Sequence, residues 1–262
     1  MLKNKKLFIS DMDGTFYLGS KLLTGSLDFA TKVREIGGKL VFLTNNSSRT
    51  PEEYIRKLLN MGIDRSLFEV YTSGEATIRF IKEHCSGASV YLIATPSVEN
   101  LFIESGIRLV NERPDAVVLT YDTTLDYAKI RNAALFLRAG AKYIASHPDF
   151  NCPTELGPIP DVGSLIKLFE ASTGRVPDHI IGKPDPSILE MLLKDYGFYP
   201  DECVIIGDRL YTDIECGLRA NVDAILVLSG ETTPEMVPEN HEFLVIDNVG
   251  VLAGMITEEF AV

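Results

Sequence analysis

The chain has 262 residues, of which 45% are hydrophobic, so it can bury a full core in one large domain or two smaller ones. Its 37 acidic and 25 basic residues give a net charge of −12, and it has no basic block beyond its first six residues, so a nucleic acid is not expected as its main partner. The apolar runs are too short for a membrane span or a signal peptide, and the four cysteines form no Cys-x-x-Cys pair, which makes a cytoplasmic protein without disulfides or zinc the expectation.

The order of elements predicts two α/β units. Up to residue 74 the strands and helices alternate as β-α-β-α-β, which is typical of a doubly wound parallel sheet. From about residue 75 a second, smaller unit begins, and near residue 178 the chain returns to the first pattern. The expected strands are 7–10, 39–43, 68–71, 90–94, 116–119, 143–145, 178–181, 203–206, 224–228 and 243–246, and the main expected helices are 22–36, 51–62, 97–104, 125–139 and 162–172.

The apolar run Leu7–Ser10 ends at Asp11, Asp13 and Gly14, as a buried strand does when it carries a site at its carboxyl end. Three interpretations compete for these acids. An Asp-Gly pair can form a hairpin turn, although the residues that follow do not pair convincingly with the run. A calcium loop is excluded, because its sixth and twelfth positions, counted from Asp11, are not Gly and Glu. The third interpretation is a tight turn whose two carboxylates hold a hard cation and supply a nucleophile.

Small polar residues follow the strand 39–43, beginning with Thr44, Asn45 and Asn46. Such a loop can bind an anion through its hydroxyls and backbone amides. The alternative is a loop that only caps the next helix. That helix, however, has its own capping box at residues 50–53, so the hydroxyls of the loop stay available.

Two later strand ends also carry charged side chains. Lys183 follows one apolar run, and Asp208 follows another. Asp213 could be only an acid at a helix start, because Thr212 begins a capping-box pattern there, but Asp208 has no such explanation. Since the carboxyl ends of parallel strands meet at one edge of a sheet, we expect these side chains to converge with those of the first two strand ends.

A Pro-rich loop, residues 146–161, leaves the last strand of the second unit and contains His147, Asn151 and Cys152. Its position at a strand end is one where ligands usually bind. His147 is better explained as a hydrogen-bonded loop histidine than as a metal ligand or catalytic base. Cys152 is best explained as a partly buried thiol.

The spacing of the motifs sets the domain organisation. One loop and one helix fit between Asp11 and Thr44, whereas the distance from Thr44 to Lys183 is several times what a crossover requires. We therefore predict a discontinuous core of residues 1–74 and 179–262, with residues 75–178 inserted as a cap domain.

The strand ends resemble, in order, the four motifs of the haloacid dehalogenase (HAD) superfamily of phosphatases. These motifs are Asp11-Met12-Asp13-Gly14-Thr15, Thr44-Asn45-Asn46, Lys183, and the run from Gly207 to Asp213. The loops after residues 43 and 145 are similar to those of the NagD-like, p-nitrophenylphosphatase branch, and this resemblance covers nearly the full length. One departure is Thr120, where many relatives have glycine; it affects the shape of the second domain and not the chemistry.

The resemblance implies a Rossmann-like HAD core with a smaller α/β cap, and a phosphoric monoester hydrolase that acts on small molecules such as sugar phosphates or nucleotides. It implies that Asp11 is the nucleophile of an aspartyl-phosphate mechanism and that Asp13 is the general acid and base. Mg²⁺ would be the cofactor. The implied catalytic residues are Asp11, Asp13, Thr44 and Lys183, the implied metal residues are Asp11, Asp13, Asp208 and Asp213, and the implied phosphate-binding residues add Asn45 and Asn46. Because the loop after residue 145 is rigid and leaves a cap strand at its C-terminal end, we also expect it to face the leaving group and screen water, with His147 and Asn151 among the substrate-binding residues.

Three other activities stay open. A phosphotransferase or phosphomutase would use the same intermediate and pass the phosphoryl group to another hydroxyl. A non-catalytic sensor of a phosphorylated metabolite would not need a nucleophile beside an acid. A dehalogenase shares the fold, but the second carboxylate, Asp13, and the metal-binding Asp208 favour phosphate.

Overall fold

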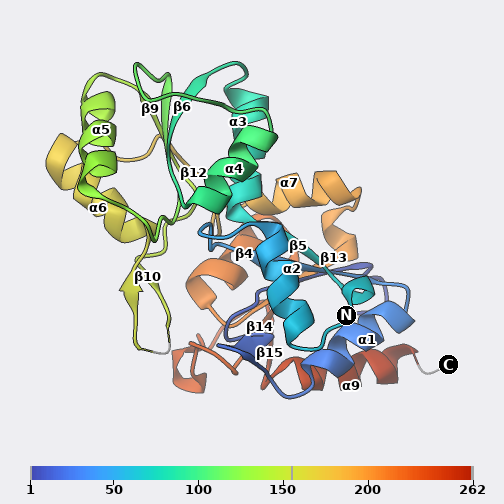
Figure 1. Ribbon diagram of the computed structural model, residues 1–262. Coiled ribbons are helices and arrows are strands. Elements are labelled where there is room, and N and C mark those ends of the chain that lie inside the picture. Colours follow the sequence, from blue (N-terminus) through green and yellow to red (C-terminus); the bar gives the residue numbers. More distant parts are fainter. Residues whose placement is uncertain (1, 155, 261–262) are drawn as a thin grey trace. The chain divides into compact units, whose positions relative to one another are not determined.

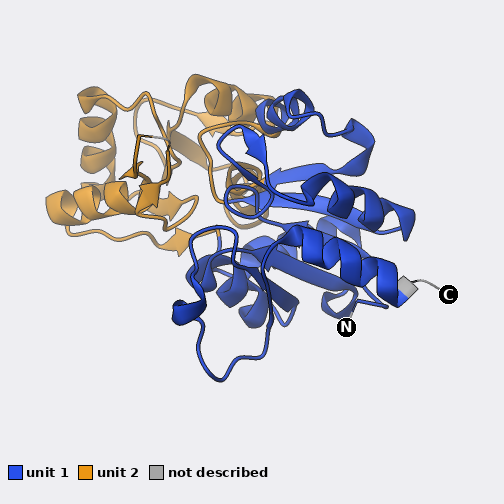
Figure 2. Ribbon diagram, turned by 90° about the horizontal axis from the view of Figure 1, so that it is seen from below, with its two compact units in different colours: residues 1–44, 52–71, 183–262 blue, residues 45–51, 72–182 orange. Residues whose placement is uncertain are grey.

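The computed structural model describes residues 2–154 and 156–260, which form two compact units (Figures 1 and 2). The first unit contains the chain up to Thr44, residues 52–71, and the chain from Lys183 onward. The second contains residues 45–51 and 72–182. The predicted domain limits stay a prediction. By packing, the segments 45–51, 72–74 and 179–182, which we had expected in the core, belong to the second unit.

The first unit is built on a six-stranded sheet with the order β15-β14-β13-β1-β4-β5. β1 lies between β13 and β4 and runs parallel to both, so that Ser10 is level with Ile206 on one side and Phe42 on the other. All four residues of β1 are buried, as expected for a strand covered on both faces. The strands are β1 (Leu7–Ser10), β4 (Lys39–Thr44), β5 (Glu69–Thr72), β13 (Cys203–Gly207), β14 (Asp223–Val227) and β15 (Leu244–Ile246), with the hairpin β2 (Tyr17–Leu18) and β3 (Lys21–Leu22).

Helices cover this sheet and close an apolar core around its strands. Phe8 of β1 and Phe42 of β4 are fully buried in that core, and Phe8 contacts Phe29 of the first helix edge to face. The helices are α1 (Ser26–Glu35), α2 (Pro51–Asn60), α7 (Ser187–Tyr196), α8 (Glu215–Arg219) and α9 (Val249–Phe260), with short turns η1 (Arg65–Leu67), η2 (Pro200–Glu202) and η4 (Pro234–Met236) and a π-helix η3 (Leu210–Ile214).

The second unit has its own five-stranded parallel sheet with the order β12-β9-β8-β6-β7. Its core gathers Tyr143, Phe169 and the buried faces of β6, β8 and β9. Among the described residues, no helix is both long and apolar enough to cross a membrane. The elements are β6 (Ser89–Ile93), β7 (Arg108–Leu109), β8 (Ala116–Leu119), β9 (Lys142–Ala145), β12 (His179–Ile180), the hairpin β10 (Asn151–Cys152) and β11 (Ile159–Pro160), and helices α3 (Ser73–His84), α4 (Pro96–Glu104), α5 (Tyr127–Arg138) and α6 (Val162–Thr173).

The predicted doubly wound α/β core with a second α/β unit is confirmed, with two corrections to single elements. The expected helix 22–36 begins only at Ser26, because Lys21–Leu22 pairs with Tyr17–Leu18. The expected core strand 178–181 is wrong: β12 pairs with β9 and therefore belongs to the second sheet.

Candidate active site

Asp11 follows the central strand of the first unit. Its backbone N–H donates to the carbonyl of Ile206, 2.8 Å away, which extends the β1–β13 pairing by one residue into the loop. The chain then turns at Gly14, whose φ is +86° and whose N–H donates to the carbonyl of Tyr17. A side chain at Gly14 would also meet Asp208, since an added Cβ would lie 2.6 Å from its Oδ2. Glycine is therefore required here by conformation and by space.

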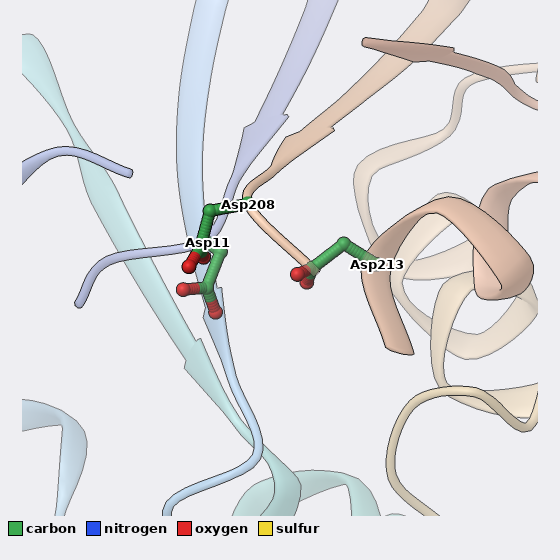
Figure 3. Close-up of side chains that lie close together, drawn as sticks. All are labelled: Asp11, Asp208 and Asp213. Atoms are coloured by element: carbon green, nitrogen blue, oxygen red, sulfur yellow. The ribbon is translucent and has the colours of Figure 1, made fainter. Parts of the chain in front are cut away.

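Three carboxylates meet at this sheet edge (Figure 3). One oxygen each from Asp11, Asp208 and Asp213 lies within 4.8 Å of the others, and the last two residues are buried. Burial raises the pKa of Asp11 to about 7, and the charges of Asp213 and Asp208 add to this effect. Burial, again with help from Asp213, raises the pKa of Asp208 to about 6. The carboxylates are therefore costly to ionise together without a cation.

Lys183 supplies one cation to this cluster. Its Nζ donates to Oδ1 of Asp11 at 2.7 Å, to Oδ1 of Asp213 at 2.5 Å and to the carbonyl of Leu43 at 3.0 Å. Burial lowers the pKa of Lys183, but the charges of Asp11 and Asp213 outweigh this and raise the pKa above its ordinary value. Lys183 is therefore held as an ammonium ion. Its meeting with Asp11 agrees with the expected convergence, although the strand before it belongs to the second sheet.

Asp213 is placed by a π-helix and not by the capping box expected at Thr212. The helix α8 begins at Glu215, and its N-cap residue, Ile214, makes no side-chain capping bond. Oδ2 of Asp213 instead accepts from the backbone N–H of Arg209 and the hydroxyl of Thr212, both at 3.3 Å. Single π-turns are frequent at functional sites, because the extra residue re-aims a side chain.

Asp208 is held by residues 229–231, which are not among the predicted site residues. Its Oδ2 accepts from the backbone N–H of Glu231 at 2.7 Å, and its Oδ1 accepts from the hydroxyl of Thr15 at 3.1 Å. The hydroxyl of Ser229 donates to the carbonyl of Gly14, 2.8 Å away. The sequence does contain a signal for this loop: Ser229, Gly230 and Glu231 follow the apolar run that ends at Leu228, as the other site loops follow theirs.

Asp13 and Thr44 lie in the same unit but outside the carboxylate cluster. Thr44 is the last residue of β4 and is buried. Asp13 is half-buried. Burial raises the pKa of Asp13, while the charges of Lys57 and Arg209 partly lower it. A carboxyl group with a raised pKa is a better proton donor near neutral pH than an ordinary one.

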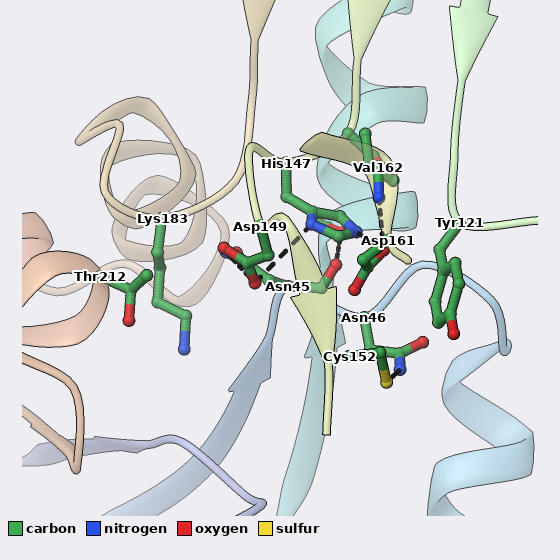
Figure 4. A network of polar contacts seen from close by, with 12 residues as sticks. Asn45, Asn46, Tyr121, His147, Asp149, Cys152, Asp161, Val162, Lys183 and Thr212 are labelled. Atoms are coloured by element: carbon green, nitrogen blue, oxygen red, sulfur yellow. Dashed lines mark hydrogen bonds and ion pairs between the residues drawn. The ribbon is translucent and has the colours of Figure 1, made fainter. Parts of the chain in front are cut away.

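The four other predicted residues, Asn45, Asn46, His147 and Asn151, all belong to the second unit, and Figure 4 shows the first three. The amide of Asn46 donates to Sγ of Cys152 at 3.8 Å. His147 is buried, and its two ring nitrogens face carboxylates. Asn151 is exposed at the start of β10. That these residues bind substrate stays a prediction.

The comparisons with known proteins agree with this arrangement. Residues 8–108 match the family described as haloacid dehalogenase-like hydrolase, and residues 180–252 match a HAD-hydrolase-like family. An acid sugar phosphatase of Staphylococcus haemolyticus is 34% identical over 92% of each chain. The crystal structure of a 4-nitrophenylphosphatase from Thermotoga maritima is 44% identical, with a TM-score of 0.93 over 97% of this chain and 98% of that one. A glycerol phosphate phosphatase from Mycobacterium tuberculosis, solved in complex with magnesium, is 27% identical, with a TM-score of 0.85 over 95% of this chain and 77% of that one.

Proposed function

Since this chain belongs to the haloacid dehalogenase-like hydrolases and is a phosphatase, we propose that it hydrolyses small phosphomonoesters with Mg²⁺ through an aspartyl-phosphate on Asp11. The observation that carries this proposal is the contact of Lys183 with Asp11 inside a cluster of three carboxylates. The charges of Lys183 and Arg209 offset only part of the charge of three ionised carboxylates, and a further positive charge would favour the approach of a phosphate.

The donor set fits a hard cation. Carboxylate oxygens are the ligands that Mg²⁺ prefers, and the cluster offers three of them within 4.8 Å. Asp11 and Asp208 would hold the ion, with the backbone carbonyl of Asp13, while Asp213 is engaged with Lys183. When bound, the ion would offset the negative charge of the nucleophile and of the phosphate. The magnesium complex of the mycobacterial relative supports this assignment.

The proposed reaction has two steps, formation of the aspartyl-phosphate and its hydrolysis. In the first, an oxygen of Asp11 attacks phosphorus, the ester P–O bond breaks, and Asp13 donates its proton to the leaving alkoxide. In the second, Asp13 takes a proton from water, the resulting oxygen attacks phosphorus, and the bond to Asp11 breaks to release inorganic phosphate. The raised pKa of Asp13 suits it to both proton transfers. Lys183 and the hydroxyl of Thr44 would bind the transferring oxygens.

The proposed substrates are small phosphate esters of sugars, nucleosides or similar alcohols. The named relatives act on a sugar phosphate, a nitrophenyl phosphate and glycerol phosphate, which share only a phosphate on a small organic group. Phosphate release measured without an added acceptor alcohol distinguishes this hydrolase from a phosphotransferase, which would release phosphate only slowly.

Trapping the intermediate tests the proposal. We expect acid-quenched wild-type protein, incubated with radiolabelled nitrophenyl phosphate and Mg²⁺, to carry label that hydroxylamine removes and that maps to the peptide with Asp11. Asp11→Asn should carry no label and show no turnover. Asp28→Asn, which changes an exposed acid of α1, should behave as wild type. Label on another peptide, turnover by Asp11→Asn, or full activity in the presence of a chelator would contradict the proposal.

A further inference from the structure

A network of buried and half-buried polar side chains in the second unit ends at the side chain of Asn45. The Nδ2 of Asn45 donates to both carboxylate oxygens of Asp149, each at 3.2 Å. Nδ1 of His147 lies 3.7 Å from Oδ2 of Asp149, and Nε2 of the same ring lies 3.5 Å from Oδ1 of Asp161 (Figure 4). We propose that Asp149, supported by His147 and Asp161, is a positioning residue that fixes the side-chain amide of Asn45. Asn45 directly follows Thr44 in the sequence. This inference rests on the proposed phosphatase mechanism.

Burial makes this network specific. The side chain of His147 is fully buried, and the side chains of Asp149 and Asp161 are only 12% and 4% exposed. A carboxylate in such surroundings is stable only with donors or a cation next to it. The imidazole lies between the two carboxylates, and the side-chain amide of Asn45 donates to that of Asp149. Each side chain in this network therefore limits where its neighbour can lie.

The backbone around the network leaves little room for another arrangement. An added Cβ at Gly182 would lie 2.6 Å from Oδ1 of Asn45 and 2.7 Å from Cβ of His147. An added Cβ at Gly163 would lie 2.2 Å from the carbonyl oxygen of Pro148. Gly182 thus allows the segment before Lys183 to pack closely against Asn45 and His147. Gly163 allows the loop that carries Asp149 to pack closely against the start of α6.

The start of α6 anchors both acids. Asp161 is the N-cap residue of this helix, and its Oδ1 accepts from the backbone N–H of Val162 at 2.7 Å. The backbone N–H of Gly163 donates to the carbonyl of Asp149, 2.8 Å away. A helix end is a rigid support, so the carboxylate of Asp149 is presented from a fixed backbone.

Asn45 is also held at its backbone, because the hydroxyl of Ser73 donates to its carbonyl at 2.5 Å. The carbonyl of the Asn45–Asn46 peptide and the side chain of Asn45 are thus both held, which restricts the position of the residue that directly follows Thr44. Asp149 only accepts hydrogen bonds, so it also determines that Nδ2 of Asn45, and not Oδ1, faces it. Asp149 would therefore influence the reaction through Asn45, without touching the substrate itself.

A double-mutant cycle tests this role. We expect Asp149→Ala and Asn45→Ala each to lower kcat/KM for nitrophenyl phosphate by about 10-fold to 100-fold, as loss of a supporting hydrogen bond does at comparable sites. The double variant should be no worse than Asn45→Ala alone, because Asp149 acts through Asn45. Asp149→Asn keeps an acceptor oxygen and should recover at least half of the loss on a logarithmic scale. Losses that multiply in the double variant would overturn the proposal.

Matched variants separate this outcome from misfolding and from a wrong mechanism. Asp126→Ala removes another N-cap acid of the second unit and should lower thermal stability without changing kcat/KM. If Asp149→Ala does not fold, the same cycle is run with Asp149→Leu, which removes the acceptor oxygens and keeps most of the side-chain volume, and wild-type kcat/KM of that variant would overturn the proposal. If wild type has no phosphatase activity or Asp11→Asn retains it, the proposed function fails; if these behave as expected and the cycle is additive, only the positioning role fails.

Discussion

Gly230 and Asp208 are so close that an added Cβ at Gly230 would lie 2.0 Å from Oδ2 of Asp208. Because the neighbouring Glu231 N–H holds that same oxygen, Gly230→Ala must displace the carboxylate or the loop. We expect the Mg²⁺ concentration for half-maximal activity to rise by about 10-fold to 100-fold, the usual effect of disturbing a group that supports a metal ligand. A Mg²⁺ titration of phosphate release measures it.

The control is Gly254→Ala in α9, where an added Cβ meets no atom within 4 Å. This variant should leave the Mg²⁺ titration unchanged and raise helix stability slightly. An unchanged Mg²⁺ titration for Gly230→Ala would show that Asp208 is not a metal ligand or that the loop adapts freely.

Asp13→Asn should keep the metal site and lose most turnover. The substitution preserves the size and the backbone carbonyl of residue 13 but removes the proton that the leaving group requires. We expect kcat to fall by about 100-fold to 10,000-fold with an unchanged Mg²⁺ dependence. A substrate with a good leaving group, such as nitrophenyl phosphate, should lose less in its first step than an alkyl phosphate. Wild-type kcat with an alkyl phosphate would show that Asp13 is not the general acid.

Lys183→Met should affect both stability and activity. It leaves Asp11 and Asp213 buried without their ammonium partner, which typically costs about 3–5 kcal/mol in the free energy of unfolding. We expect this loss in urea denaturation near neutral pH and a smaller loss in mildly acidic buffer, where Asp11, whose pKa is raised to about 7, can take up a proton. Turnover should fall by at least about 100-fold.

Lys82→Met, at an exposed position of α3, is the control for Lys183→Met and should show neither effect. Equal losses of stability for Lys183→Met in the two buffers would indicate that the destabilisation comes from packing and not from unpaired charge.

The metal-free protein should lose stability as the pH rises through the range in which the carboxylate cluster ionises. The pKa of Asp11 is raised to about 7 and that of Asp208 to about 6, so between about pH 4 and these values the folded protein binds more protons than the unfolded chain. The free energy of unfolding therefore falls with rising pH in this window. Thermal unfolding with a chelator measures this slope.

Added Mg²⁺ should remove most of that loss, because it binds the ionised carboxylates of the folded state. The increase in Tm on adding Mg²⁺ should thus be larger above neutral pH than in mildly acidic buffer. An equal increase at both pH values would mean that the ion binds elsewhere than at Asp11 and Asp208.

Local sequence patterns could predict the parts of the site that follow single strands. Asp11 and Asp208 were found because each ends an apolar run, and the two runs, β1 and β13, are neighbours in the sheet. The predicted convergence of Lys183 with Asp11 agrees with the contact between their side chains. The predicted place of the preceding strand is wrong, because that strand belongs to the sheet of the second unit. Two short parallel strands look alike in sequence, and their partners are set by long-range pairing.

Other groups could not be found in this way. The bonds from Asn45 to Asp149, and from Glu231 to Asp208, join residues far apart in the chain, and no periodicity encodes such pairs. The π-helix before Glu215 carries an extra residue per turn that a capping-box pattern does not reveal. Side-chain contacts of this kind depend on how the whole chain packs.

The packing of residues 45–51 with the second unit has a consequence for protein engineering. Ser47 contacts Ser146 and the backbone N–H of Tyr121, and the carbonyl of Ser48 accepts from Thr95. A chimera that exchanges residues 72–182 for those of a relative would replace the partners of this segment while keeping the segment itself. Residues 45–51 should therefore be transplanted together with residues 72–182. In a minimal core without residues 72–182, the segment 45–51 would lose these partners and be exposed to solvent.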